Sequence, residues 1–501
     1  MAKKKKKKGM FSKLTSKGII LTIQLIASAV FLGYIYVLKM LPTRYYAILI
    51  IVLIALLLLE MIWITSGARR KRRTGKGFRI FISKFVSVAL SALLIVGSVY
   101  ASQGNSFLSN ITSAFTQTRV IAVYAMKQGK INKVEDLKGK TIGVENKTSV
   151  SSITDALAQV QEKIGKEPEK KNYSDYADLA DALYKGEVDC IVADQSYLGV
   201  LETNHESFED ETKVVYKMEV QEKLEAVTTT DVTENPFIVY ITGIDTYGSV
   251  NTISRADVNL VVCVNPLEKQ VLMVSVPRDT QVNLHKNGKM DKITHSAMYG
   301  INETIQTLED FLDLKVNYYA KTNFSGITNI IDALGGVEVD SPYEFTTLHG
   351  NYKIKKGVNE LNGDQALCFV RERYALPSGD FDRGKNQQRL LKAMLKKAMS
   401  PKIITNYSNI LAAVEGSFET DMSSDDIKSL VNMQLDDMAN WEMFNVQVTG
   451  DGAISYDTYS QKGKKTYITI PYKKSIQNIR KVIDKIEAGK KLTEADVKGL
   501  S

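Results

Sequence analysis

Charged side chains gather at the ends of three apolar segments that are typical of β-strands in the second half of the chain. In chain order these charged residues are Asp245, Arg255, Asp257, Arg278 and Asp279. In an open α/β sheet, ligands bind outside the strand ends. Arginine at such a place suits a multiply charged phosphate, because its planar fork contacts phosphate oxygens in pairs. The aspartates suit a divalent cation that bridges such phosphates.

More arginines follow further along the chain. Arg371 and Arg373 end a strand predicted over 366–370, where their i, i+2 spacing would place both guanidinium groups on one face. Arg383 and Gln387 then lie one helical turn apart. Together with the first group, these residues predict a site that grips a diphosphate.

Each of these pairs also has a purely structural interpretation. Arg278 beside Asp279 would be a surface ion pair, and Arg371 and Arg373 would lie on the solvated face of an edge strand. The number of arginines at strand ends favours the site. The chain has only four histidines, with no evident Ser–His or Cys–His pairing and no GxSxG motif, so nucleophilic triad chemistry is not expected.

The elements that must position these residues alternate between strand and helix. Three strands are apolar on both faces, which predicts a central sheet covered by helices on each side; they are 236–244, 258–264 and 270–276. The predicted helices are 294–314, 324–334, 384–398, 403–415, 424–433 and 474–488, with a strand pair near 445–448 and 466–470. We therefore predict an α/β/α sandwich with a central mixed sheet over residues 236–490 and a solvated tail at 491–501.

A smaller α/β region is expected before this sandwich. Residues 119–230 alternate strand and helix, with strands at 119–125, 140–144 and 188–193 and helices at 151–164 and 176–184. Two of its phrases, VEDLKGKTIGVENKTS and LADALYKGEVDCIVAD, are similar to one lobe of an extracellular solute-binding protein. Without a second lobe, we favour an accessory domain with scaffold or partner-binding work. Residues 102–118 are polar and predict a linker.

Three apolar runs near the N-terminus are long enough to span a bilayer, since a span needs about 20 mostly apolar residues. They are 18–38, 45–65 and 80–101 within a transmembrane region at 18–101, after a basic tail at 1–17. The tail and the second loop carry most of the positive charge, which marks the cytoplasmic side. The chain beyond residue 101 is therefore predicted to be extracellular, anchored by three spans with the N-terminus inside.

The net charge of +9 follows from this topology. Residues 1–84 hold 18 Lys or Arg against one acid, Glu60, which is +17 and leaves −8 for the rest. The exported part is thus mildly acidic, so no nucleic-acid partner is expected. Cys190, Cys263 and Cys368 each lie in an apolar stretch and predict buried small side chains, with neither disulfides nor a zinc site.

Six segments in order resemble the LytR-CpsA-Psr family: VYITGIDTYG, SRADVNLVVCVNP, VLMVSVPRDT, GGVEVD, LNGDQALCFVRER and DFDRGKNQQ. The resemblance implies a phosphotransferase that moves a glycopolymer, here a capsular polysaccharide, from a polyprenyl diphosphate carrier onto peptidoglycan. Many members have a second arginine before the paired glutamines, where this chain has Asn386. That departure loosens one possible polar contact and leaves Arg383 and Gln387 in place.

The resemblance also implies a role for each matching position. Mg²⁺ would be the cofactor, held by Asp245 and Asp257. The diphosphate or lipid head would be held by Arg255, Arg278, Arg371, Arg373, Arg383 and Gln387. The catalytic group would be Asp245, Asp257, Arg255, Arg278 and Arg383. The carrier's lipid needs an apolar slot, for which the helices at 294–314 and 324–334 are candidates, although both also suit an ordinary core.

Two rival functions use the same features. One is a non-catalytic, membrane-bound regulator of capsule biosynthesis or transcription. The cytoplasmic segments are too short for a folded DNA-binding module, which argues against direct regulation. The other is a hydrolase that cleaves the lipid diphosphate and releases polymer. The expected partners are the polyprenyl-linked polysaccharide, peptidoglycan, the membrane and other capsule-assembly proteins.

Overall fold

A computed structural model describes residues 16–39, 41–74, 78–112, 116–224, 230–244, 249–398 and 415–500. Four predicted features lie outside these residues: the basic tail up to Lys13, Lys76, Asp245 and nearly all of the helix at 403–415. The chain forms two compact units, 1–110 with 423–439, and 111–422 with 440–501. Each unit is described separately.

The first unit contains three long helices, α2 (Lys17–Val37), α3 (Thr43–Thr74) and α4 (Phe78–Ile111). All three are long and apolar enough to cross a membrane, which supports the predicted anchor. The short helix α15 (Ser424–Asp437) belongs to this unit, where Tyr45 Oη donates to the Leu435 carbonyl at 3.0 Å. The predicted linker is helical up to Ile111, because no proline interrupts α4 there.

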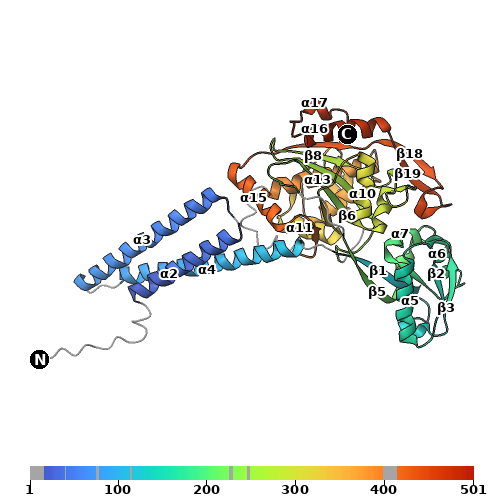
Figure 1. The fold of residues 1–501 in the computed structure, drawn as a ribbon, viewed down its shortest axis with the longest axis horizontal. Coiled ribbons are helices and arrows are strands. Elements are labelled where there is room, and N and C mark those ends of the chain that lie inside the picture. The colour runs from blue at the N-terminus through green and yellow to red at the C-terminus, as the bar shows by residue number, and fades with distance from the viewer. Residues whose placement is uncertain are drawn as a thin grey trace. The chain divides into compact units, whose positions relative to one another are not determined.

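The accessory region in the second unit, drawn in teal and green in Figure 1, is a five-stranded sheet in the order β3-β2-β4-β1-β5. Its strands are β1 (Thr116–Met126), β2 (Thr141–Glu145), β3 (Glu169–Tyr173), β4 (Cys190–Asp194) and β5 (Thr212–Lys223). Its helices are α5 (Val150–Ile164), α6 (Tyr176–Tyr184), α7 (Leu198–Leu201) and α8 (Phe208–Glu211). The three strands and two helices predicted here are confirmed, with boundaries shifted by a few residues.

The larger region has a six-stranded mixed sheet in the order β16-β11-β6-β7-β8-β17. Its strands are β6 (Phe237–Ile244), β7 (Ala256–Asn265), β8 (Gln270–Ser275), β11 (Tyr318–Thr322), β16 (Phe418–Thr420) and β17 (Glu442–Gln447). Two-stranded sheets surround it: β9 (Gln281–Asn283) with β10 (Met290–Lys292), β12 (Val337–Ser341) with β15 (Gly357–Leu361), β13 (Phe345–Thr346) with β14 (Lys353–Ile354), and β18 (Gly450–Ser455) with β19 (Thr466–Pro471). The predicted mixed α/β fold is confirmed.

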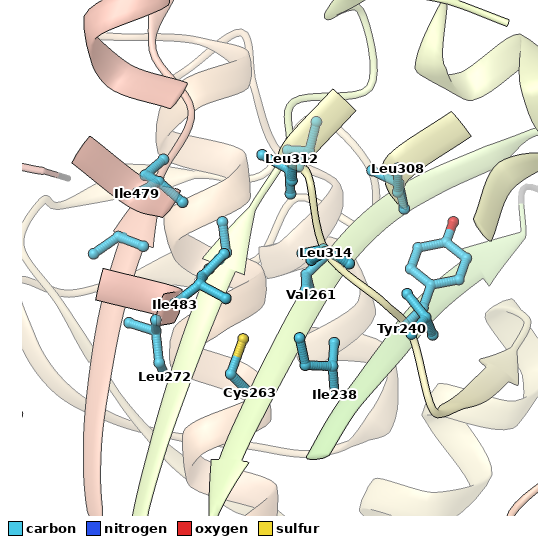
Figure 2. Close-up of a cluster of buried hydrophobic side chains, with 14 of the residues drawn as sticks. Ile238, Tyr240, Val261, Cys263, Leu272, Leu308, Leu312, Leu314, Ile479 and Ile483 are labelled. Atoms are coloured by element: carbon cyan, nitrogen blue, oxygen red, sulfur yellow. The ribbon is translucent and has the colours of Figure 1, made fainter. Parts of the chain in front are cut away.

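Helices cover both faces of this sheet. They are α9 (Ile293–Ser296), α10 (Ile301–Leu312), α11 (Phe324–Ala333), α12 (Gly363–Arg371), α13 (Asp380–Ala398), α16 (Lys473–Glu487) and α17 (Glu494–Val497). On one face, α10 and α16 bury Leu308, Leu312, Ile479 and Ile483 against Val261 and its neighbours (Figure 2). The apolar side chains of α10 therefore serve the core. The helix predicted at 294–314 is broken at Gly300, whose φ is 107°.

Three predictions in this region are wrong. Residues 366–370 belong to helix α12, because Asn362 and Gln365 form a capping box that starts a helix there. The segments at 445–448 and 466–470 do not pair with each other: β17 is parallel to β8, and β19 pairs with β18. The tail at 491–501 is not solvated, since Leu492 and Val497 are buried in the main core.

Candidate active site

The pair Asp257 and Arg278 forms the centre of the candidate site. Asp257 is the second residue of β7, and Arg278 follows the end of the antiparallel neighbour β8. Arg278 Nη1 donates to both carboxylate oxygens of Asp257, at 2.8 Å each. The hairpin register thus brings together two residues that are 21 positions apart in the chain.

The electrostatics of this pair depend on neighbouring arginines. Burial alone would raise the pKa of Asp257, but the charges of Arg278, Arg383 and Arg255 hold that pKa well below its usual range. Asp257 in turn raises the pKa of Arg278. Asp257 is therefore an ionised carboxylate among three guanidinium groups, and the site keeps an excess of positive charge for an anionic ligand.

Helix α13 contributes Asp380 and Arg383, which form an ion pair in its first turn. The helix is fixed to the sheet by Gln388, whose Nε2 donates to the carbonyls of Met273 at 3.0 Å and Val446 at 2.8 Å. A side chain at Gly384 would overlap neighbouring polar groups of the sheet, so glycine permits this close approach. These contacts hold Arg383 near Asp257.

Arg371 and Arg373 have different surroundings from those predicted. Arg371 ends α12, and its guanidinium carbon lies 4.1 Å from the ring centre of Phe324. Arg373 lies over Tyr374, with 4.6 Å between guanidinium carbon and ring centre. Between them, buried Glu372 accepts three backbone hydrogen bonds, from residues 348, 373 and 375. The two arginines do not share one face of a strand.

Two further charged residues border the centre. Asp279 is buried and accepts from Lys292 Nζ at 2.9 Å, and Lys292 was not predicted from the sequence as a site residue. Burial would raise the pKa of Asp279, but Lys292 and Arg278 lower it overall. Gln387 is half-buried on α13, one turn beyond Arg383.

The carboxylates here suit a hard divalent cation. Burial raises the pKa of Asp380, and the charges of Asp279 and Asp257 add to this effect against the opposing Arg383. Asp380 Oδ1 is buried, and its partner among the described residues is the Arg383 guanidinium, with which it forms the ion pair. Oxygen donors of this kind fit Mg²⁺. Among the described residues, which exclude Asp245, no group of three or more His, Cys, Asp and Glu side chains is arranged to hold a metal ion.

Comparison with known proteins assigns this chain to a family. The profile of the LytR_cpsA_psr family matches residues 201–479, more than half of the chain. The chain belongs to the LytR-CpsA-Psr family. The matched residues contain every predicted arginine of the site, together with Asp245, Asp257 and Gln387.

Curated relatives agree with this membership. The chain is 35% identical over 218 residues to a protein of Bacillus cereus (strain AH820) named polyisoprenyl-teichoic acid–peptidoglycan teichoic acid transferase TagU, covering 43% of this chain and 70% of that one. The protein of the same name from Enterococcus faecalis (strain ATCC 700802 / V583) is 36% identical over 200 residues, which are 39% of this chain and 65% of that one. Among solved structures, TagV of B. subtilis matches at 26% identity with a TM-score of 0.44, covering 51% of this chain and 98% of that one.

A second profile, described as NMT1/THI5 like, matches residues 100–232. This match falls on the accessory region. The larger region, built around the six-stranded sheet, is called the LytR-CpsA-Psr domain below.

Within the LytR-CpsA-Psr domain, Asn386 has a structural role of its own. It is buried, and its Oδ1 accepts from Arg389 Nη1 at 2.8 Å. Its Nδ2 donates to the Phe369 carbonyl at 3.5 Å, which links α13 to α12. The departure from the common family pattern therefore does not leave an empty position.

Proposed function

We propose that this protein is a membrane-anchored phosphotransferase that moves a glycopolymer from a polyprenyl diphosphate carrier onto peptidoglycan. The observation that carries the proposal is the cluster of Asp257 and Arg278, which are half-buried at the strand ends, with buried Arg383 of α13. Arg278 Nε is buried and lies 3.9 Å from Asp279 Oδ2, but it makes no hydrogen bond within the described residues, so it has a donor to offer a phosphate oxygen. The names of the TagU relatives supply the donor and acceptor classes.

The proposed step requires positioning and charge neutralisation. A hydroxyl oxygen of a peptidoglycan sugar attacks the phosphorus bonded to the polymer, and the bond from that phosphorus to the bridging oxygen breaks. Polyprenyl phosphate leaves with the bonding electron pair, and the hydroxyl proton passes to water. The product is a phosphodiester between polymer and peptidoglycan. Arginines that stabilise developing negative charge are sufficient for such chemistry, since phosphoryl transfer needs no covalent nucleophile on the enzyme.

The transferred polymer can be named more narrowly. We propose that it is a capsular polysaccharide, as the sequence resemblance implied. Teichoic acid, the polymer in the relatives' names, is the alternative. Parallel assays with carriers of both kinds separate the two.

Mg²⁺ is proposed as the cofactor, held by Asp257 together with Asp245, with Asp380 nearby as a further oxygen donor. The bound cation would neutralise phosphate charge. We expect EDTA to abolish transfer and added Mg²⁺ to restore it, measured as polymer bound to peptidoglycan. Full activity in EDTA would remove the metal from the proposal.

The orientation of the anchor gives a separate prediction. The excess of Lys and Arg in the tail and second loop leads us to propose that the chain after residue 101 is extracellular. In intact protoplasts, added protease should digest this part and spare the loop around Arg72, as followed with antibodies to each region. Protection of the LytR-CpsA-Psr domain would contradict the proposed orientation.

One incubation tests the function against its rivals. The full chain in detergent is mixed with a lipid-diphosphate oligosaccharide, Mg²⁺ and peptidoglycan fragments, and the products are analysed by mass spectrometry. We expect an oligosaccharide–phosphate–peptidoglycan adduct. Free oligosaccharide phosphate with no adduct would indicate the hydrolase, and unchanged substrate would favour the non-catalytic regulator.

A further inference from the structure

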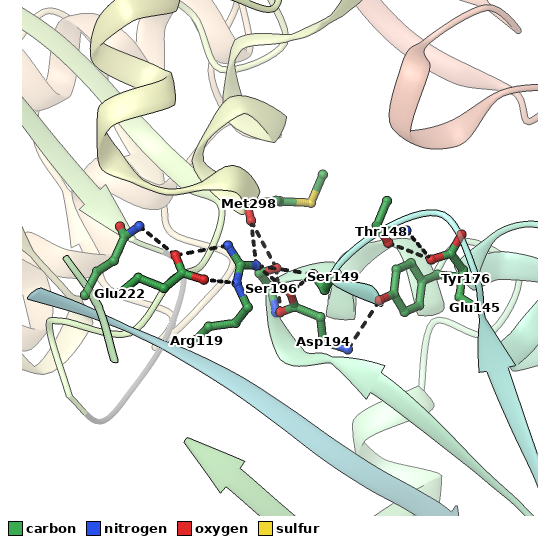
Figure 3. A network of polar contacts seen from close by, with 10 residues as sticks. Arg119, Glu145, Thr148, Ser149, Tyr176, Asp194, Ser196, Glu222 and Met298 are labelled. Carbon is green, nitrogen blue, oxygen red and sulfur yellow. Dashed lines mark hydrogen bonds and ion pairs between the residues drawn. The ribbon is translucent and has the colours of Figure 1, made fainter. Parts of the chain in front are cut away.

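The turn at Met298 joins the accessory region to the LytR-CpsA-Psr domain. The Met298 carbonyl accepts from Arg119 Nη1 at 3.3 Å and from Ser196 Oγ at 3.4 Å (Figure 3). Its side chain is 0% exposed and packs in the accessory core with Tyr197. Helix α7 follows Tyr197 directly, so this junction fixes α7 against the LytR-CpsA-Psr domain within one compact unit.

Helix α7 brings Gly199 against Arg255. A Cβ atom at Gly199 would overlap the Nη1 and Cζ atoms of Arg255, since real Cβ atoms do not approach other heavy atoms within 3.0 Å. The backbone of Gly199 does not have a positive φ. Space and not backbone conformation therefore makes glycine special here: the Arg255 guanidinium fills the place that any other side chain would occupy, and a larger residue would have to displace it.

Arg255 connects this contact to the candidate site. It lies two residues before Asp257 and directly precedes β7, and its charge helps to hold the pKa of Asp257 low. Of the arginines near Asp257, Arg255 has its guanidinium against the backbone of Gly199 in the accessory region. The accessory region thus reaches the candidate diphosphate site at Gly199.

We propose that Gly199 is a positioning residue for the transfer reaction. It seats the guanidinium of Arg255 beside Asp257, so that Arg255 is held ready for the carrier diphosphate. The NMT1/THI5-like profile matches the accessory region. In this proposal the accessory region forms part of the active site and does not bind a solute of its own. This inference rests on the proposed function and adds a role for the accessory region to it.

The test is a Gly199→Ala substitution in the full chain in detergent. The added methyl group meets only the end of a flexible side chain, and Gly→Ala in a helix does not oppose folding. We expect unchanged thermal stability, with binding of farnesyl diphosphate weakened about tenfold, because a charge-assisted contact is lost or misplaced. Gly33→Ala is the matched control: its added methyl meets no atom within 4 Å, and binding should not change.

A double-mutant cycle with Arg255→Ala separates positioning from a structural effect. If Gly199 acts through Arg255, Gly199→Ala should cause no further loss in the Arg255→Ala background. Equal losses in both backgrounds, or normal binding by Gly199→Ala, would overturn the inference while leaving the proposed function intact. Failure of the unaltered chain to bind the diphosphate would overturn the proposed function and the inference with it.

Discussion

The substitution Arg278→Ala is expected to reduce transfer strongly and to destabilise the LytR-CpsA-Psr domain. Arg278 contacts both oxygens of Asp257, and the two side chains are only 19% and 18% exposed. Removal of one partner from a buried ion pair costs about 3–5 kcal/mol, and the partial exposure here places the cost at the lower end. Loss of a charge-assisted contact to the diphosphate alone should reduce turnover at least about tenfold.

Arg278→Lys separates the two effects. Lysine keeps the positive charge beside Asp257 but lacks the planar fork that grips two oxygens at once. We expect this variant to recover most of the thermal stability while transfer stays low. Lys491 is exposed, so Lys491→Ala serves as a control that should change neither thermal stability nor transfer. Normal turnover of Arg278→Lys would mean that the fork does not hold the diphosphate.

The second large effect is expected at Arg119 in the accessory region. Arg119 pairs with Asp194, which is 0% exposed, and with Glu222 (Figure 3). Arg119→Ala would leave the Asp194 charge buried without its cationic partner, which costs about 3–5 kcal/mol. Hydrogen exchange followed by mass spectrometry should show faster exchange in β1 and β4, the strands that carry Arg119 and end at Asp194.

A surface pair on the same sheet serves as the control. Lys217 and Glu219 are ion-paired at 3.0 Å, but their side chains are 49% and 55% exposed. Exposed pairs contribute about 0–1 kcal/mol, so Lys217→Ala should leave exchange in β1 and β4 almost unchanged. Equal exchange rates in the Arg119→Ala and Lys217→Ala variants would show that the buried network does not stabilise the accessory region.

Much of the fold could be predicted because the relevant signals are local. The strands β6, β7 and β8 are continuous apolar runs, and α6 was predicted with the boundaries it has, Tyr176–Tyr184. The strand predicted at 366–370 was wrong because a short apolar run suits either a strand or a buried helix. The capping residues Asn362 and Gln365 were the signal that would have decided it.

Pairing across long distances could not be predicted in the same way. That β17 joins β8 over more than 170 positions depends on the assembled sheet, and no local pattern encodes it. The predicted tail failed for a similar reason, since only the folded core shows where Leu492 and Val497 pack.

In the candidate site, too, local signals could be predicted and long-range ones could not. Asp257 and Arg278 were correctly predicted to be neighbours from their positions at strand ends, because adjacent antiparallel strands bring the end of one beside the start of the other. The misassigned strand at 366–370 gave Arg371 and Arg373 a shared face that they do not have. The contact of Gly199 with Arg255 could not be predicted from a single sequence, because nothing local in the sequence distinguishes a glycine that makes room for a distant side chain.

The central claim is that the phosphate attached to the polymer moves with it, and an isotope label tests this most directly. A polyprenyl diphosphate oligosaccharide is prepared with ³²P only in the phosphate bonded to the sugar and is incubated with the full chain and peptidoglycan fragments. We predict that the label enters peptidoglycan together with the oligosaccharide and that Arg278→Lys prevents this. Label that remains on the lipid while sugar enters peptidoglycan would show attack at carbon, and label released in solution regardless of acceptor would show hydrolysis; either result would contradict phosphoryl transfer.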